Sequence, residues 1–109
     1  MILMTDPCDR TNRIIVRIDS DLEELIPQYL KNRRRDVQSI LADLESGDYQ
    51  AIGVIGHSMR GSGGGYGFEI ISRIGEEMEL SADSKSAGQI RKSVEELSDY
   101  LDRVEVVYV

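Results

Sequence analysis

Residues 53–68 decide how the chain is organised, and their sequence is Gly53-Val-Ile-Gly-His-Ser-Met-Arg-Gly-Ser-Gly-Gly-Gly-Tyr-Gly-Phe68. They hold the one histidine, His57, and most of the ten glycines of this 109-residue protein. We predict a helix over residues 49–62 because positions on one of its sides recur at helical spacing. The positions on that side are Ala51, Val54, Ile55, Met59 and Ser62. His57 then lies on a different, polar face of the helix.

Glycines flank His57 along its own face, with Gly53 one helical turn before it and Gly61 one turn after it. Gln50 and Gly64 lie two turns away and share this face if the helix extends that far. A glycine inside a helix destabilises it by roughly 1 kcal/mol relative to alanine. Glycine on both sides of the histidine therefore indicates that a protein surface must come close to the ring. We assign Gln50, Gly53 and Gly64 to the supporting or docking part of the site.

Arg60 adds an anion-binding group to the same region of the helix. It follows His57 by three residues, so its guanidinium can reach the space above the ring. A neutral imidazole can attack through a ring nitrogen, and arginine binds phosphate oxygens through a fork of N–H donors. The pair therefore predicts a phosphoryl acceptor.

The run from His57 to Ser62, His-Ser-Met-Arg-Gly-Ser, together with Gly67, resembles the motif of the histidine phosphotransfer (HPt) domain family. That motif is His-x-Leu/Met-Lys/Arg-Gly-Ser/Ala followed by a further Gly. The resemblance implies an all-α, up-down four-helix bundle whose histidine exchanges a phosphoryl group with an aspartate of a response-regulator receiver domain. The chain departs from the family pattern at Arg60, where Lys is commoner, and at 63–65, where three glycines replace a Ser/Ala-rich helix.

The resemblance also implies roles for individual residues. His57 accepts the phosphoryl group on the ring nitrogen furthest from the backbone, Arg60 offsets the phosphoryl charge, and Gly61 leaves room for the docking partner. We further expect Ser62 and Gln50 to hydrogen-bond near the imidazole. No metal or cofactor is expected on this chain, because the Mg²⁺ ion belongs to the partner receiver domain.

Other phosphate-binding motifs fit the glycine-rich stretch poorly. No Gly-Lys-Ser/Thr follows it, and Tyr66 and Phe68 interrupt a Gly-x-Gly-x-x-Gly pattern. Without a nucleotide-binding element the chain is not predicted to be a kinase or another enzyme. Its expected partners are a receiver domain, a hybrid histidine kinase or both. Two alternatives remain: a four-helix interaction module that binds such domains without transferring phosphate, and a regulator phosphorylated directly by a kinase.

Composition indicates one soluble domain. Apolar residues make up 40% and charged residues 30% of the chain, and no apolar run approaches membrane-spanning length. Cys8 is the one cysteine and has no partner for an internal disulfide, so we predict a cytoplasmic protein. The net charge of −7 disfavours nucleic acid as a partner. We expect a monomer.

The two ends of the domain are rich in β-forming residues. We predict a flexible leader over residues 1–12 and a single domain over 13–109. Residues 13–18 and 104–109 are the two β-rich runs, and we expect them to pair beside the bundle. The alternative is that residues 104–109 continue the last helix.

Helix signals divide the rest of the chain into four segments. A capping box over 20–23, with Asp19 as the alternative cap, starts a short turn over 21–26. The first long helix begins at Pro27 and ends at Gly47, and Asp48 caps the helix that carries His57. We expect the glycine-rich stretch to make the turn into a third helix. Apolar residues mark the third and fourth helices: Phe68, Ile71, Ile74 and Met78, then Ala87, Ile90, Val94, Leu97, Leu101 and Val104.

A basic run, Lys31-Asn-Arg-Arg-Arg35, lies on the first long helix. The simplest interpretation is a solvated face. The alternative is a patch that meets the acidic pocket of a receiver domain.

Overall fold

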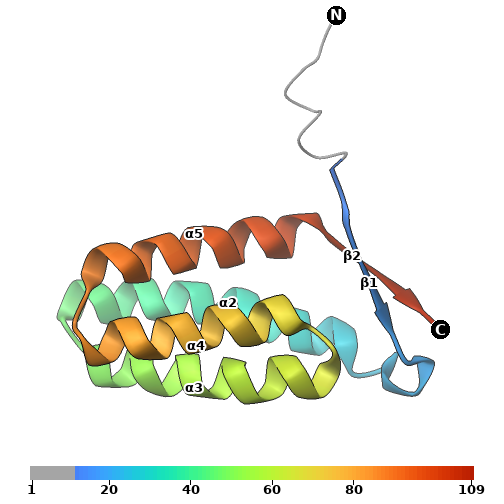
Figure 1. Ribbon diagram of the computed structural model, residues 1–109, viewed down its shortest axis with the longest axis horizontal. Coiled ribbons are helices and arrows are strands. Elements are labelled where there is room, and N and C mark those ends of the chain that lie inside the picture. The colour runs from blue at the N-terminus through green and yellow to red at the C-terminus, as the bar shows by residue number, and fades with distance from the viewer. Residues whose placement is uncertain (1–11) are drawn as a thin grey trace, which may run out of the picture.

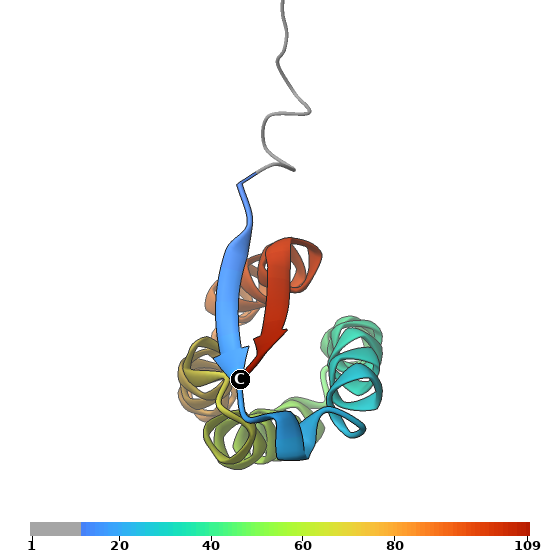
Figure 2. The ribbon, with the colours of Figure 1, turned by 90° about the vertical axis from the view of Figure 1, so that its right-hand side faces the viewer.

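The computed structural model describes residues 12–109, which form an up-and-down arrangement of four helices (Figure 1). The helices are α2 (Ile26–Ser46), α3 (Tyr49–Tyr66), α4 (Glu69–Asp83) and α5 (Ala87–Arg103). Figure 2 shows the four helices arranged around a common centre, and their buried apolar side chains form one core. The predicted four-helix fold is confirmed. The predicted leader, Cys8 included, lies outside the described residues except for Asn12. None of the helices in residues 12–109 has the length and apolarity needed to cross a membrane.

The two ends of the described chain pair as parallel strands beside the bundle. β1 (Ile14–Ile18) and β2 (Val104–Tyr108) align with Ile14 beside Val104 and Ile18 beside Tyr108. The Val109 N–H donates to the Ile18 carbonyl over 2.9 Å and extends the ladder. The predicted pairing is therefore confirmed, and residues 104–109 do not continue the last helix.

The local signals for the first long helix act much as predicted. Pro27 lies in the first turn of α2, where its missing N–H breaks no helical hydrogen bond, and Gly47 ends the helix with a left-handed φ of 74°. The capping box over 20–23 is wrong, and the alternative cap, Asp19, is confirmed. Asp19 caps the short 3₁₀ turn η2 (Ser20–Leu22), and its Oδ1 accepts the Asp21 N–H over 2.8 Å.

Helix α3 is longer than predicted. Asp48 caps it, since its Oδ1 accepts the Ala51 N–H over 3.1 Å. The helix then runs through all three glycines at 63–65, so the predicted turn in that stretch is wrong. The turn comes at Gly67, whose φ of 95° ends the helix, and the Phe68 N–H donates to the Gly63 carbonyl over 2.7 Å. The turn from α3 into α4 needs one residue in the left-handed conformation, and Gly67 supplies it.

The buried face of α3 also differs from the predicted one. Met59 is buried as expected, but Val54 is exposed, and Ile52 takes its place in the core. The buried face contains two glycines, Gly56 and Gly63, that lie against α4. Hydropathy alone missed this face because glycine carries no apolar side chain to mark it.

Glycine allows α3 and α4 to pack backbone against backbone. A Cβ added to Gly75 of α4 would lie 2.5 Å from the backbone nitrogen of Arg60 and 2.6 Å from the carbonyl oxygen of Gly56. A Cβ on Gly63 would lie 2.6 Å from the Ser72 nitrogen. These distances are far below van der Waals contact, so the two helices can approach this closely only without those side chains.

Most of the remaining predicted core positions are confirmed, but Ala87 and Val104 are only partly buried, and Val104 begins β2 instead of ending the α5 seam. Phe68 and Ile71 are fully buried at the start of α4, and the α5 seam is buried at its central positions. The fully buried large side chains come from every helix and from β1: Ile18, Ile26, Ile40, Ile52, Met59, Phe68, Ile71, Ile74, Met78, Ile90 and Leu97.

Candidate functional site

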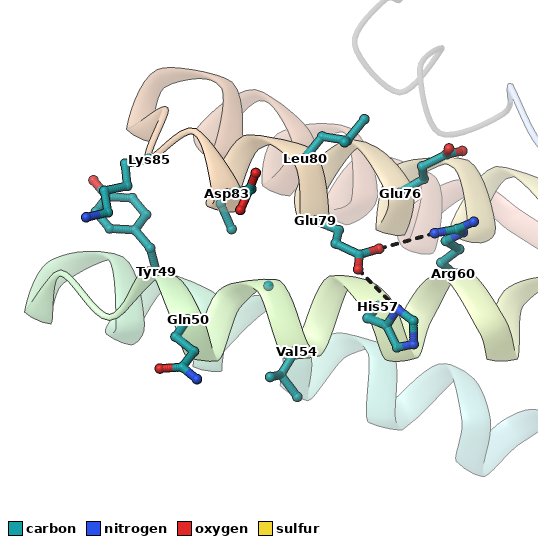
Figure 3. Close-up of a pocket in the computed structure, with 12 residues that line it drawn as sticks. Tyr49, Gln50, Val54, His57, Arg60, Glu76, Glu79, Leu80, Asp83 and Lys85 are labelled. Carbon is teal, nitrogen blue, oxygen red and sulfur yellow. Dashed lines mark hydrogen bonds and ion pairs between the residues drawn. The ribbon is translucent and has the colours of Figure 1, made fainter.

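His57 projects from the outer side of α3 into solvent. Its side chain is 72% exposed, yet the ring is held at one nitrogen: Nδ1 lies 3.1 Å from Oε2 of Glu79 on α4 (Figure 3). The other ring nitrogen, Nε2, forms no hydrogen bond with any residue in 12–109. The imidazole is therefore oriented by the protein while its outer nitrogen stays accessible.

Glu79 joins His57 to Arg60. Its Oε1 lies 3.5 Å from Nη1 of Arg60, while its Oε2 faces the imidazole. One carboxylate thus fixes the two side chains that the sequence analysis selected (Figure 3). Sequence reasoning missed Glu79, which lies 22 residues after His57 on another helix and has no spacing that links the two.

The close packing of α3 on α4 brings Glu79 to the histidine. Gly75 lies one helical turn before Glu79, and Gly56 immediately precedes His57. A Cβ on Gly56 would lie 2.8 Å from the Glu79 nitrogen. The Ser72 hydroxyl adds a polar link, since it donates to the Arg60 carbonyl over 2.7 Å. The backbones beside the site are therefore locked together at the level where the three side chains meet.

The glycines of the predicted docking surface occupy different environments. Gly53 lines a groove beside His57, where an added Cβ would lie 3.7 Å from the Ala82 Cβ. Gly61 lies in open space: apart from its chain neighbours and the adjacent backbone of α3, no atom of residues 12–109 lies within 4 Å of an added Cβ. Gly64 faces Ser72, whose Oγ would lie 3.8 Å from an added Cβ. An added side chain would thus meet a neighbour at Gly53 and Gly64, but not at Gly61.

Ser62 and Gln50 do not hold the imidazole in this structure. Ser62 faces α2 instead: its Oγ lies 3.1 Å from the Tyr29 hydroxyl and accepts from Nη1 of Arg33 over 3.2 Å. Gln50 lies along α3 away from the ring, in the same groove (Figure 3). The expectation that Ser62 fixes the ring is wrong, because it lies on the side of α3 that faces α2.

Two side chains of the basic run on α2 form ion pairs and hydrogen bonds within the protein. Arg33 stacks over the Tyr29 ring and pairs with Asp36 over 2.8 Å. Burial raises the pKa of the Asp36 carboxyl, against the lowering effect of Arg33. Arg34 binds Asp102 over 3.1 Å and the Leu101 carbonyl over 2.7 Å. Arg33 is therefore packed within the protein, whereas Lys31, Arg34 and Arg35 are exposed and match the solvated face that the sequence predicted.

The Glu79 contact assigns the chemistry of the ring. When a neutral imidazole donates its Nδ1–H to the carboxylate, the lone pair is on Nε2. That nitrogen is the one furthest from the backbone, and it is the exposed one. The arrangement can therefore present a nucleophile to an electrophile from outside, with the Arg60 guanidinium nearby to interact with an anion. Within residues 12–109, no group of three His, Cys, Asp or Glu side chains could hold a metal ion.

No protein-family model, no curated protein and no solved structure matches this chain. The geometry of this site and the motif around His57 are therefore the observations that bear on function.

Proposed function

We propose that this protein is a histidine phosphotransfer protein, which carries a phosphoryl group on His57 between the aspartates of receiver domains. The observation that carries the proposal is the contact between Nδ1 of His57 and Glu79, which leaves Nε2 free at the surface. Arg60 belongs to the same cluster through its ion pair with Glu79. A histidine that served only packing would not be 72% exposed and oriented by a carboxylate.

In the proposed reaction, a receiver domain bearing an aspartyl phosphate docks over His57, and Nε2 attacks the phosphorus in line. The nitrogen–phosphorus bond forms while the bond between phosphorus and the aspartyl oxygen breaks, and the carboxylate leaves with the electron pair. The proton stays on Nδ1 and remains hydrogen-bonded to Glu79, whose negative charge offsets the positive charge that the ring acquires. The partner supplies the Mg²⁺ ion, and the reverse sequence returns the phosphoryl group to a receiver aspartate.

Arg60 contributes charge rather than a bond. Three residues after His57, it can reach the phosphoryl oxygens once the partner has docked, and a fixed guanidinium is suited to such an anion. To do so, it must exchange part of its 3.5 Å contact with Glu79 for the phosphoryl group. We propose that the protein acts in the cytoplasm as a monomer. The phosphoryl donor is a receiver domain or a hybrid histidine kinase.

The test is transfer of radioactive phosphate from phosphorylated receiver domains to the wild-type protein and to His57→Gln. We expect acid-labile label on the wild type and none on the variant. Because His57 is exposed, the substitution should change the free energy of unfolding by less than about 0.5 kcal/mol. Circular dichroism and urea unfolding provide this control. Label on His57→Gln would overturn the assignment, and binding of a receiver without any transfer would support the interaction-module alternative.

A further inference from the structure

Two large apolar side chains stand exposed on either side of the groove beside His57. Val54, one turn before His57 on α3, is 64% exposed, and Leu80, next to Glu79 on α4, is 65% exposed. Figure 3 shows Leu80 on α4 and Val54 on α3, with their side chains pointing away from each other, and both line the groove. Among the large apolar residues in 12–109, the terminal Val109 alone is more exposed. Two such side chains beside a reactive group are typical of a surface that another protein covers.

The floor of the groove is made of small residues. Gly53 and Ala82 meet there, and the groove encloses about 740 Å³. It extends along α3 from Arg60 to Tyr49. At 1.5 Å per residue, that is roughly 16 Å, or about three turns of a helix. The groove therefore has the length of a short helix laid along it.

The charges of the groove are mainly acidic on its α4 side. Glu76, Glu79 and Asp83 line it there. Glu79 is paired with His57 and Arg60, whereas Glu76 and Asp83 form no ion pair with residues 12–109. Lys85 is the basic residue at the far end. An occupant that completes this surface carries positive side chains next to its apolar ones.

The surface on the other side of His57 is different. Toward the C-terminal end of α3, the outward positions are Gly61, Gly64 and Gly65, which provide clearance without apolar contact area. A partner can therefore make apolar contacts on the Val54 side of His57. On the opposite side the glycines leave space and offer no apolar side chains.

We propose that the receiver domain docks on one side of His57, by laying a basic amphipathic helix in the groove between Val54 and Leu80. This inference rests on the proposed function and adds which surface of the receiver is recognised. Apolar side chains of that helix pack on Val54 and Leu80, and its Lys or Arg side chains face Glu76 and Asp83. Docking in this way brings the aspartyl phosphate to Nε2 at the end of the groove.

The experiment compares Leu80→Ser and Val54→Ser with Leu41→Ser, a matched control on α2 that is 39% exposed and outside this groove. The probes are a small phosphoramidate donor and a panel of receiver domains from the same genome, phosphorylated before mixing. We expect each groove variant to raise the KM for the receiver about tenfold, as for a contact residue at a protein interface, and to leave labelling by phosphoramidate unchanged. Leu41→Ser should match the wild type with both donors.

Charge reversal tests the chemistry of the occupant separately. Asp83→Lys should weaken receiver docking and reduce its dependence on salt, because it removes the attraction for a basic helix. Equal KM values for Leu80→Ser and Leu41→Ser, or faster docking of Asp83→Lys, would overturn the inference that the receiver docks in the groove. Continued transfer through His57 in those variants would leave the proposed function intact. If no receiver and no phosphoramidate labels His57, the proposed function fails and this inference fails with it.

Discussion

The glycines of α3 fall into two groups that look alike in the sequence and differ in the structure. Gly56 and Gly63 face α4, where an added Cβ would lie 2.8 Å and 2.6 Å from backbone atoms. Gly61 and Gly65 face solvent: apart from their chain neighbours and the adjacent backbone of α3, no atom of residues 12–109 lies within 4 Å of an added Cβ. The inner glycines are explained by packing within the molecule. The outer glycines lower the stability of the helix with no compensating contact in residues 12–109, and the docking of a partner, as proposed above, would account for them.

The inner group also determines the geometry of the site. Because the helices touch along Gly56 and Gly75, Glu79 reaches His57 and Arg60 directly. A wider separation of α3 and α4 would leave the imidazole exposed but unoriented. In the proposed function, the inner glycines position His57 and the outer glycines give a partner access to it.

The largest effect should come from Gly75→Ala on the inner side. Its Cβ would lie 2.5 Å from the backbone nitrogen of Arg60. A backbone atom of a packed helix cannot move aside unless the whole helix is displaced. We expect a loss of about 3 kcal/mol in the free energy of unfolding, measured by urea denaturation. The ¹⁵N shifts of the His57 ring should change as well, because Glu79 moves away with α4. A loss below about 1 kcal/mol would mean that the close approach is not required.

An intermediate effect is expected on the outer side, at Arg60. Arg60→Ala leaves the nucleophile in place and removes a charge that is half exposed, so transfer from a receiver should slow about tenfold without stopping. Stability should hardly change, because exposed ion pairs contribute little. Arg60→Lys should recover much of the rate, which single-turnover labelling measures. A wild-type rate for Arg60→Ala would remove the guanidinium from the mechanism.

The smallest effect, and one of opposite sign, is expected for Gly61→Ala. This outer position has open space around it, so alanine should stabilise the protein by up to about 1 kcal/mol through its higher helix propensity. It should leave phosphoryl transfer intact. Urea denaturation beside Gly75→Ala provides the direct comparison.

Gly61→Gln sharpens the same test by adding bulk. It should fold, yet react more slowly with a phosphorylated receiver than with a small phosphodonor, because the side chain stands in the way of a protein surface only. Equal losses for both donors, or no loss for either, would show that Gly61 does not clear the docking surface.

Sequence reasoning worked best where a signal acts within one turn of the chain. Asp48 begins α3 because its carboxylate accepts a free backbone N–H of the first turn. Gly47 ends α2 because it adopts a left-handed φ. Sequence reasoning failed at 63–65, where glycines usually taken as a loop stay helical. Their helix persists because Gly63 packs on α4 and Gly67 supplies the turn.

The sequence by itself determined the four helices, the pairing of its two β-rich ends, and the placement of His57, Arg60 and Gly61 on the outer side of one helix. The helices and the positions on α3 follow from hydrogen bonding and side-chain spacing within a few residues. The pairing was predicted because residues 13–18 and 104–109 are the two β-rich runs of the chain. Only the tertiary structure decided that Glu79 holds Nδ1, that Ser62 faces α2, and that Val54 and Leu80 border one groove. Those relations depend on how far apart α3 and α4 lie and how they are turned, which backbone contacts at Gly56 and Gly75 determine and local signals do not encode.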